Sequence, residues 1–360
     1  MCGHSPQRLY PRHISECSTE PATFGPIWTR KNFGTEAQIY LSLDASMSLR
    51  SRLRVLPTAI SLASGSSRHA FQHQQWKPSC RVATGSVHAF SAIASSFDDK
   101  RVSLVQGASR GLGLEFVTQL LRGSQALPSL AGGHVVATCR NPEKAEALQE
   151  LATSHPGRLT ILPLDVTDEA TIKAAATAVK TKLGRLDLLL NVTGVLHIPD
   201  VLTPETSLSK VTSESLLLSF QTNAMGPLLV TQAFEALLSS TAANAANSGD
   251  PVVVANLSAR VGSIEDNRLG GWYSYRSSKS ALNQLTRTMA VDFARKRNPV
   301  ICVMLHPGTA DTDLTKPFQK NVPELFTPER AVKQLLEILA GLKKEDTGKF
   351  YAWDGKIVPF

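Results

Sequence analysis

Short apolar runs alternate with longer helical segments along residues 98–360, and this alternation constrains the fold more than any other feature. Strands are predicted at 102–106, 134–139, 159–165, 186–191, 252–257, 300–305 and 349–353. Helices are predicted at 112–121, 143–152, 168–183, about 213–240, 275–297 and 328–342. This alternation is typical of βαβ units, and near-continuous apolar runs suit strands covered on both faces. The sequence therefore predicts an α/β fold, a single domain with a doubly wound parallel sheet.

Residues 1–97 differ in composition from this domain. No Asp or Glu occurs between Met47 and Phe97, whereas arginine and serine are frequent. An arginine-rich, serine-rich and acid-poor segment is typical of an organellar transit peptide. We therefore expect a disordered N-terminal extension with a targeting region, import into a mitochondrion favoured over a chloroplast, and Met47 as a candidate true start. The alternative is a tail without an address, which would leave the protein cytoplasmic.

Composition excludes several other classes of function. The formal net charge of +8 is divided between residues 1–99 and the rest, and no cluster of Lys and Arg with interleaved aromatics occurs. Nucleic-acid binding is therefore not expected. No apolar stretch reaches the 18 or so residues of a membrane span, so no span is expected. The five cysteines and nine histidines show no spacing that suits zinc, and no metal site is expected.

A glycine-rich turn follows the first predicted strand, in Gly107-Ala-Ser-Arg-Gly111-Leu-Gly113. Glycines at such a turn let the backbone approach a pyrophosphate and let the next helix pack close to the strand. The N-terminus of that helix offers N–H donors and a positive dipole to the phosphate. Because the turn lies between a strand and a helix of a βαβ unit, it predicts a dinucleotide site.

Two arginines indicate which dinucleotide binds. An acidic residue after the second strand of such a fold binds the ribose 2′-hydroxyl of NAD(H), whereas arginine suits the 2′-phosphate of NADP(H). Here the second strand is followed by Arg140, and Arg110 lies within the glycine turn. Two guanidinium groups favour NADP(H) over NAD(H).

Tyr275 and Lys279 stand four residues apart and therefore share one face of a predicted helix. A free tyrosine has a pKa of about 10, and a nearby positive charge favours the phenolate and lowers that pKa. The pair therefore suits proton transfer to or from a carbonyl or alcohol oxygen.

The chain resembles the short-chain dehydrogenase/reductase family over about residues 100–360. The motifs that carry the resemblance come in the family's order: the glycine turn, Asp165, Asn191-Val-Thr-Gly194, Asn223, Ser258, the Tyr275/Lys279 pair and Pro307-Gly308. The phrases Leu257-Ser-Ala-Arg-Val-Gly-Ser263 and Gly271-Trp-Tyr-Ser-Tyr-Arg276 are similar to the sniffer/C-factor-like carbonyl reductases. Two departures are Gln106, where the family often has Thr, and Asn191-Val-Thr-Gly194, where it usually has Asn-Asn-Ala-Gly.

The resemblance implies a Rossmann-type fold, a small carbonyl or alcohol substrate, and a homodimer or homotetramer. Cofactor-binding roles are implied for Gly107, Ser109, Arg110, Gly111, Leu112, Gly113, Arg140, Asp165, Val166, Asn191, Gly194, Tyr275, Lys279, Pro307, Gly308 and Thr312. Catalytic roles are implied for Asn223, Ser258, Tyr275 and Lys279. In these roles Tyr275 protonates the substrate oxygen, Lys279 binds the nicotinamide ribose, and Asn223 holds a water that links Lys279 to solvent.

The substrate-orienting serine is left open between neighbouring positions. Counted back from Gly262, the family's serine aligns with Ala259, one residue beyond Ser258, and Ser263 is a further candidate. We assign Ser258, since a hydroxyl there would stabilise charge developing on the substrate oxygen. The predicted function is an NADP(H)-dependent oxidoreductase that interconverts a carbonyl and an alcohol. The alternative is a non-catalytic dinucleotide-binding sensor or scaffold of the same fold.

Overall fold

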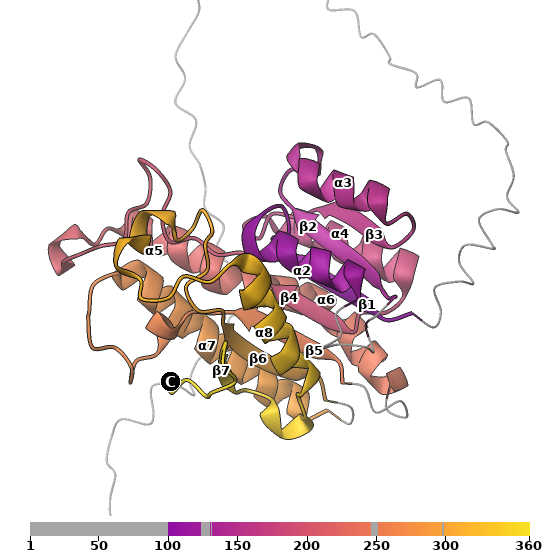
Figure 1. The fold of residues 1–360 in the computed structure, drawn as a ribbon. Coiled ribbons are helices and arrows are strands. Elements are labelled where there is room, and N and C mark those ends of the chain that lie inside the picture. Colours follow the sequence, from indigo (N-terminus) through magenta and orange to yellow (C-terminus); the bar gives the residue numbers. More distant parts are fainter. Residues whose placement is uncertain (1–99, 124–129, 131, 246–250, 297–298) are drawn as a thin grey trace, which may run out of the picture. The chain divides into compact units, whose positions relative to one another are not determined.

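Seven parallel strands form one sheet in the computed structural model, which describes residues 100–123, 130, 132–245, 251–296 and 299–360 (Figure 1). The strands are β1 (Val102–Gln106), β2 (His134–Cys139), β3 (Leu159–Pro163), β4 (Leu188–Asn191), β5 (Val253–Leu257), β6 (Ile301–His306) and β7 (Phe350–Ala352). Their order across the sheet is β3-β2-β1-β4-β5-β6-β7. The strand order therefore reverses between β1 and β4, which is where doubly wound sheets bind ligands.

Helices cover both faces of the sheet, as the sequence predicts. The helices α2 (Gly111–Arg122), α3 (Glu146–Ser154) and α8 (Pro328–Ala340) pack on one face, in a core that contains Val105, Phe116 and Leu335. The helices α4 (Glu169–Leu183), α6 (Gly226–Asn244) and α7 (Tyr273–Ala294) pack on the other face. The predicted doubly wound α/β fold is confirmed.

Local sequence explains where these helices begin and end. Asp168 caps α4 by accepting a hydrogen bond from the Ala170 amide, and Gly184 ends the helix with a φ of 66°. The helix predicted from residue 143 begins later, because Pro142–Lys144 forms a short 3₁₀ turn before α3. The helix predicted from Tyr275 begins two residues earlier, at Tyr273.

The helical region predicted around 213–240 is interrupted by a turn of π-helix. The short helix α5 (Ser213–Phe220) is followed by a π-helix at Gln221–Met225 and then by α6. The Gly226 amide donates to the Gln221 carbonyl, five residues back. Pro227, the next residue, has no amide proton to continue an α-helical hydrogen-bond pattern. The proline therefore gives a local reason for the interruption.

The predicted N-terminal extension, its targeting region and Met47 lie outside the described residues. Within the described part of the chain, no helix is long and apolar enough to cross a membrane.

A buried carboxylate joins the starts of β1 and β4. Asp187 is 1% exposed and accepts hydrogen bonds from the Val102 amide at 2.8 Å and from Arg185 at 2.8 and 3.0 Å. The guanidinium of Arg101 lies 3.3 Å from the same carboxylate. The strand pairing at this end of the sheet therefore depends on one buried negative charge.

Substitution of Asp187 by Ala should lower the free energy of unfolding by about 3–5 kcal/mol, because it leaves two partly buried guanidinium groups without their carboxylate. Urea denaturation measures this change. A matched control is Asp292→Ala, since Asp292 forms an exposed pair with Arg295 at 3.4 Å. That substitution should cost at most about 1 kcal/mol. Equal small effects of the two changes would contradict a structural role for Asp187.

Candidate active site

The glycine turn is fastened to the second strand by backbone hydrogen bonds. The amides of Gly107 and Ala108 both donate to the Thr138 carbonyl, at 3.0 and 2.9 Å. Gly107 and Gly111 have φ values of 87° and 56°, which favour glycine. A side chain at Gly113 would collide with the Gly107 carbonyl, so α2 begins directly against the turn.

The start of α2 is suited to binding an anion. Arg110 occupies the N-cap position in an extended conformation, and no side chain caps the helix there. The Arg110 side chain therefore accepts no hydrogen bond from the amides of the first turn, which suits a phosphate site.

Gln106 and Thr193, which both depart from the family pattern, contact each other. The Gln106 amide nitrogen donates to the Thr193 hydroxyl at 2.5 Å, and the Thr193 amide donates to the Gln106 side-chain oxygen at 3.3 Å. These bonds join the ends of β1 and β4 directly below the turn, since Thr193 is also what a side chain at Gly107 would meet. The departures at Gln106 and Thr193 therefore lie in one hydrogen-bonded contact.

Three of the residues predicted to bind the cofactor lie after β2 and β3, namely Arg140, Asp165 and Val166. Arg140 is exposed directly after β2. The Asp165 carboxylate accepts hydrogen bonds from the Thr167 amide and hydroxyl, at 2.9 and 2.7 Å. Val166 is buried, and its side chain fills the space where a side chain at Gly226 would stand.

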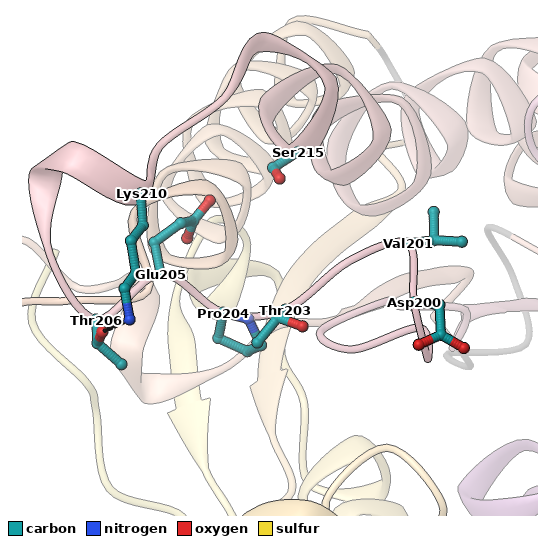
Figure 2. A pocket seen from close by; sticks show the side chains of 8 residues that line it. All are labelled: Asp200, Val201, Thr203, Pro204, Glu205, Thr206, Lys210 and Ser215. Atoms are coloured by element: carbon teal, nitrogen blue, oxygen red, sulfur yellow. Dashed lines mark hydrogen bonds between the residues drawn. The ribbon is translucent and has the colours of Figure 1, made fainter.

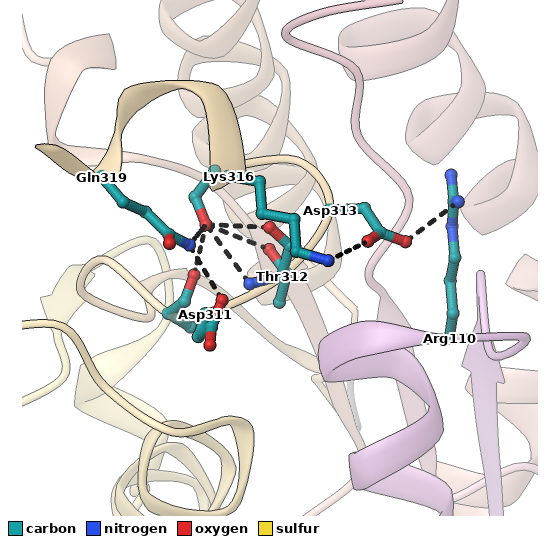
Figure 3. A network of polar contacts seen from close by, with 8 residues as sticks. Arg110, Asp311, Thr312, Asp313, Lys316 and Gln319 are labelled. Atoms are coloured by element: carbon teal, nitrogen blue, oxygen red, sulfur yellow. Dashed lines mark hydrogen bonds and ion pairs between the residues drawn. The ribbon is translucent and has the colours of Figure 1, made fainter.

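Arg110 does not lie with this group. Its guanidinium is 3.2 Å from the Asp313 carboxylate, in the segment that follows β6 (Figure 3). Lys316 lies on the other side of that carboxylate, at 3.6 Å.

Residues after β4 form the floor of the site. The Asn191 side chain is buried and donates to the Asn256 side chain at 2.8 Å, which ties β4 to β5. Asn223, in the π-helix, accepts from the Val195 amide at 2.7 Å and donates to the Val195 carbonyl at 2.8 Å. A side chain at Gly194 would stand 3.4 Å from both the Asn223 oxygen and the Lys279 Nζ. Because Gly194 has no side chain, its backbone can lie close to both the Asn223 side-chain amide and the Lys279 ammonium.

Tyr275 and Lys279 share one face of α7, as predicted. Both are buried, at 8% and 3% exposure, and Lys279 Nζ lies 5.9 Å from the centre of the Tyr275 ring. Lys279 Nζ donates to the Leu257 carbonyl at 2.8 Å, and this bond holds it at the end of β5.

Burial changes the proton affinity of both groups. Burial lowers the pKa of Lys279 to about 8. It raises the pKa of Tyr275 above its ordinary value, in the opposite direction from the expected effect of the neighbouring ammonium. Desolvation is the cause of the raised Tyr275 pKa, so the expected lowering by Lys279 is not borne out and the phenol is protonated near neutral pH.

The Ser258 hydroxyl is engaged by α7. Ser258 is 4% exposed and donates to the Asn283 side chain at 2.6 Å. The Asn283 amide in turn donates to the Gly262 carbonyl at 3.3 Å. Ser263 is also buried, and its oxygen accepts from the Asp266 amide at 3.1 Å. Ser258 therefore fastens the loop after β5 to α7.

The segment after β6 is supported by aromatic packing. Gly308 has a φ of 73°, and a side chain there would collide with the Phe326 ring. The Phe326 ring packs edge-on against Trp353, with 4.8 Å between centroids, and Arg330 lies 3.9 Å above it. Gly308, which is predicted to bind the cofactor, is thus backed by the packed side chains of Phe326, Trp353 and Arg330.

Three aromatic side chains gather beside Tyr275. The Trp272 ring packs edge-on against Tyr275 at 6.3 Å and lies 5.2 Å from Phe318. Phe318 in turn contacts the His197 ring at 6.2 Å. Trp272 has a φ of 50°, which is unfavourable for a non-glycine residue and often marks a functional site.

Glu205 holds this strained turn. Its carbonyl accepts from the Trp272 amide at 2.5 Å, and its carboxylate accepts from the Ser274 amide at 3.2 Å. Glu205 is 2% exposed and lines a hollow of about 370 Å³ (Figure 2). The other lining residues are Asp200, Val201, Thr203, Pro204, Thr206, Lys210 and Ser215. None of them is a predicted site residue, so the hollow is separate from the predicted set.

Sequence reasoning missed Glu205, Trp272 and Asp313. The glycines at 270 and 271 are a signal for an unusual turn before α7, but nothing in the sequence indicates that Glu205 binds it. Asp313 follows the predicted Thr312 directly, yet its contact with Arg110 spans 203 residues. No group of His, Cys, Asp and Glu side chains that could hold a metal ion occurs in the described part of the chain.

Comparisons with known proteins agree with this geometry. A family profile described as short chain dehydrogenase matches residues 101–323. An uncharacterised oxidoreductase of Schizosaccharomyces pombe is 31% identical over 272 residues, which cover 72% of this chain and 98% of the relative.

Solved structures that are similar to this chain include two carbonyl reductases. The crystal structure of an NADPH-bound carbonyl reductase from chicken fatty liver is 35% identical, with a TM-score of 0.63, over 72% of this chain and 99% of that one. The carbonyl reductase Sniffer of D. melanogaster is 30% identical, also with a TM-score of 0.63 and the same coverage of both chains. The chain belongs to the short-chain dehydrogenase family, and it is an oxidoreductase. Within the family it is similar to the sniffer-like carbonyl reductases.

Replacement of Lys279 by Met should raise the free energy of unfolding near pH 7 by about 1–3 kcal/mol, because it removes a buried charge and keeps a similar volume. The folded pKa of Lys279 is about 8, below its ordinary value of 10.5. The penalty of the buried charge is therefore complete below pH 8 and disappears as the pH rises toward 10.5.

Urea denaturation near pH 7 and near pH 10 tests this expectation, since the difference between variant and wild type should shrink at the higher pH. The exposed Lys182 of α4 provides a control, because Lys182→Met should give no such pH dependence. A Lys279→Met variant that is destabilised at both pH values would contradict the buried-charge penalty, because the Lys279 side chain would then stabilise the fold with or without its charge.

Proposed function

We propose that this oxidoreductase is an NADP(H)-dependent carbonyl reductase, which also catalyses the reverse oxidation of an alcohol. The observation that carries the proposal is the position of Lys279, which lies beside Asn223 at Gly194 and 5.9 Å from the centre of the Tyr275 ring. This convergence lies at the carboxyl ends of β4 and β5, next to the strand reversal where a dinucleotide binds.

The residues present fit an NADP(H) cofactor. The open N-terminus of α2 and the close approach of Gly113 to the turn suit a pyrophosphate. Arg140 supplies positive charge after β2 for a 2′-phosphate, and the similar carbonyl reductase from chicken liver is NADPH-bound. When bound, the cofactor supplies the hydride, while the protein orients and polarises the substrate.

Tyr275 is the proton donor in this proposal. Burial raises its pKa, which keeps the phenol protonated but makes it a weaker acid, so proton transfer in this proposal depends on stabilisation of the phenolate by Lys279. A proton is what an oxygen needs as a carbonyl becomes an alcohol. Lys279, held by the Leu257 carbonyl, places a positive charge next to the phenolate that remains.

A non-catalytic sensor is the alternative function, and one observation favours it. The Ser258 hydroxyl donates to Asn283, so its proton is not directed at a substrate. A sensor, however, has no use for a buried proton donor beside an ammonium. NADPH oxidation against a panel of aldehydes, ketones and diones distinguishes the two, because a sensor would bind NADPH and reduce none of them.

Substitution of Tyr275 by Phe should lower kcat by about 10²–10⁴-fold and leave NADPH affinity nearly unchanged. The ring that packs against Trp272 remains, and only the hydroxyl is lost. Steady-state kinetics and a cofactor titration measure the two quantities. Tyr273→Phe is a matched control, since Tyr273 lies in the same helical turn and is 38% exposed. Near-normal kcat in Tyr275→Phe would contradict the mechanism.

Substitution of Arg140 by Asp should weaken NADPH binding by at least about tenfold, since it places a negative charge where the 2′-phosphate is expected. NADH binding should be unchanged or stronger, because a carboxylate can accept from the ribose hydroxyl. Fluorescence titration with each cofactor measures the ratio of affinities. An equal loss of affinity for NADPH and NADH would show that Arg140 does not bind the 2′-phosphate.

A further inference from the structure

One ion pair joins two of the segments that border the expected dinucleotide site. Arg110 belongs to the turn after β1, whereas Asp313 belongs to the segment after β6, and their side chains are 3.2 Å apart (Figure 3). In the sheet, β4 and β5 lie between β1 and β6. The pair therefore joins two segments whose strands are separated by β4 and β5 in the sheet.

A second contact shows that the two segments approach each other closely. A side chain at Gly111 would stand 3.4 Å from the Thr312 methyl group, next to Asp313. The approach is therefore a feature of the backbone and does not depend on one long side chain. Asp313 also lies 3.6 Å from Lys316, which leaves its carboxylate between two cations.

The ion pair holds Arg110 on the side of the sheet away from the expected 2′-phosphate. Arg140 follows β2, which adjoins β1 on one side, whereas β6 lies on the other side of β1. One guanidinium cannot reach toward β6 and toward the end of β2 at once. For Arg110 to join Arg140 at a 2′-phosphate, it must leave Asp313.

We infer that Asp313 is a specificity-determining residue, which competes with the 2′-phosphate of NADP(H) for Arg110 and so reduces the preference for NADP(H) over NAD(H). The inference rests on the proposed cofactor. NADH lacks the phosphate, so its binding leaves the pair of Arg110 and Asp313 in place.

Charge and exposure make this competition reversible. The side chains of Arg110 and Asp313 are 74% and 57% exposed, so water and salt weaken their attraction. A phosphate carries a charge of about −1.5 to −2 and offers several oxygens to a guanidinium, whereas the carboxylate carries a single charge. The phosphate therefore displaces the carboxylate, and Asp313 lowers NADPH affinity without preventing binding.

Asp313→Asn tests the inference, because asparagine keeps the shape and removes the charge. The NADPH dissociation constant of the purified full chain, from fluorescence titration or calorimetry, should fall by about two- to fivefold. The NADH dissociation constant should not change. In the Arg110→Gln background, the added Asp313→Asn change should have no further effect on either cofactor.

Asp292→Asn is the matched control. Asp292 forms an exposed pair with Arg295 at 3.4 Å, so its substitution removes the same charge and a similar contact from the far end of α7. It should leave both dissociation constants unchanged.

Three outcomes overturn the inference: an unchanged NADPH affinity in Asp313→Asn, an equal gain for NADH, or an equal gain for NADPH without Arg110. The last would indicate direct repulsion between Asp313 and the phosphate. A wild-type chain that binds neither cofactor would instead overturn the proposed function, which keeps the two failures distinct.

Discussion

The common direction of the strands is the constraint on which the rest of the molecule depends. Because β1, β4, β5 and β6 are parallel, the turns that follow them meet at one edge of the sheet. Four separate parts of the chain therefore lie at the same edge of the sheet: the glycine turn, Gly194, the loop after Leu257 and the Pro307-Gly308 turn. An antiparallel strand among them would send its following loop to the opposite edge. The sheet topology thus decides which turns can contribute side chains to the site, and the side chains then decide its chemistry.

Buried amide and hydroxyl side chains then fix these turns against each other. Asn191 bonds to Asn256, and Asn256 bonds to Thr286 of α7 at 2.7 Å, which links two central strands to the helix of Tyr275. Asn223 likewise fixes the backbone at Val195 through two hydrogen bonds. These bonds have a direction, unlike apolar contacts, so each admits few arrangements of its partners. The residues around the proton donor are therefore held by geometry as well as by packing.

Periodicity predicted the strands and the main helices, and it predicted the shared face of Tyr275 and Lys279, because these are properties of neighbouring residues. It did not predict the π-helix, which depends on hydrogen bonds around Pro227. Nor could it give the direction of the Tyr275 pKa, since burial arises from residues distant in sequence. Gln106 and Thr193 looked like two independent departures until the fold brought them into contact. The contact of Arg110 with Asp313 could not be predicted either, because no local sequence pattern connects positions 203 residues apart.

The π-helix at Gln221–Met225 has a consequence for how this stretch of chain tolerates changes in length. Its turn contains one residue more than an α-helical turn, as the bond from the Gly226 amide to the Gln221 carbonyl shows. Deleting one residue here would restore α-helical hydrogen bonding and would leave the direction of α6 relative to α5 nearly unchanged, because a π-turn is an α-helical turn with one residue inserted. The face of α6 that buries Val230 and Phe234 would then still pack against the sheet. Homologous sequences can therefore differ by one residue between α5 and α6 and keep the same buried face.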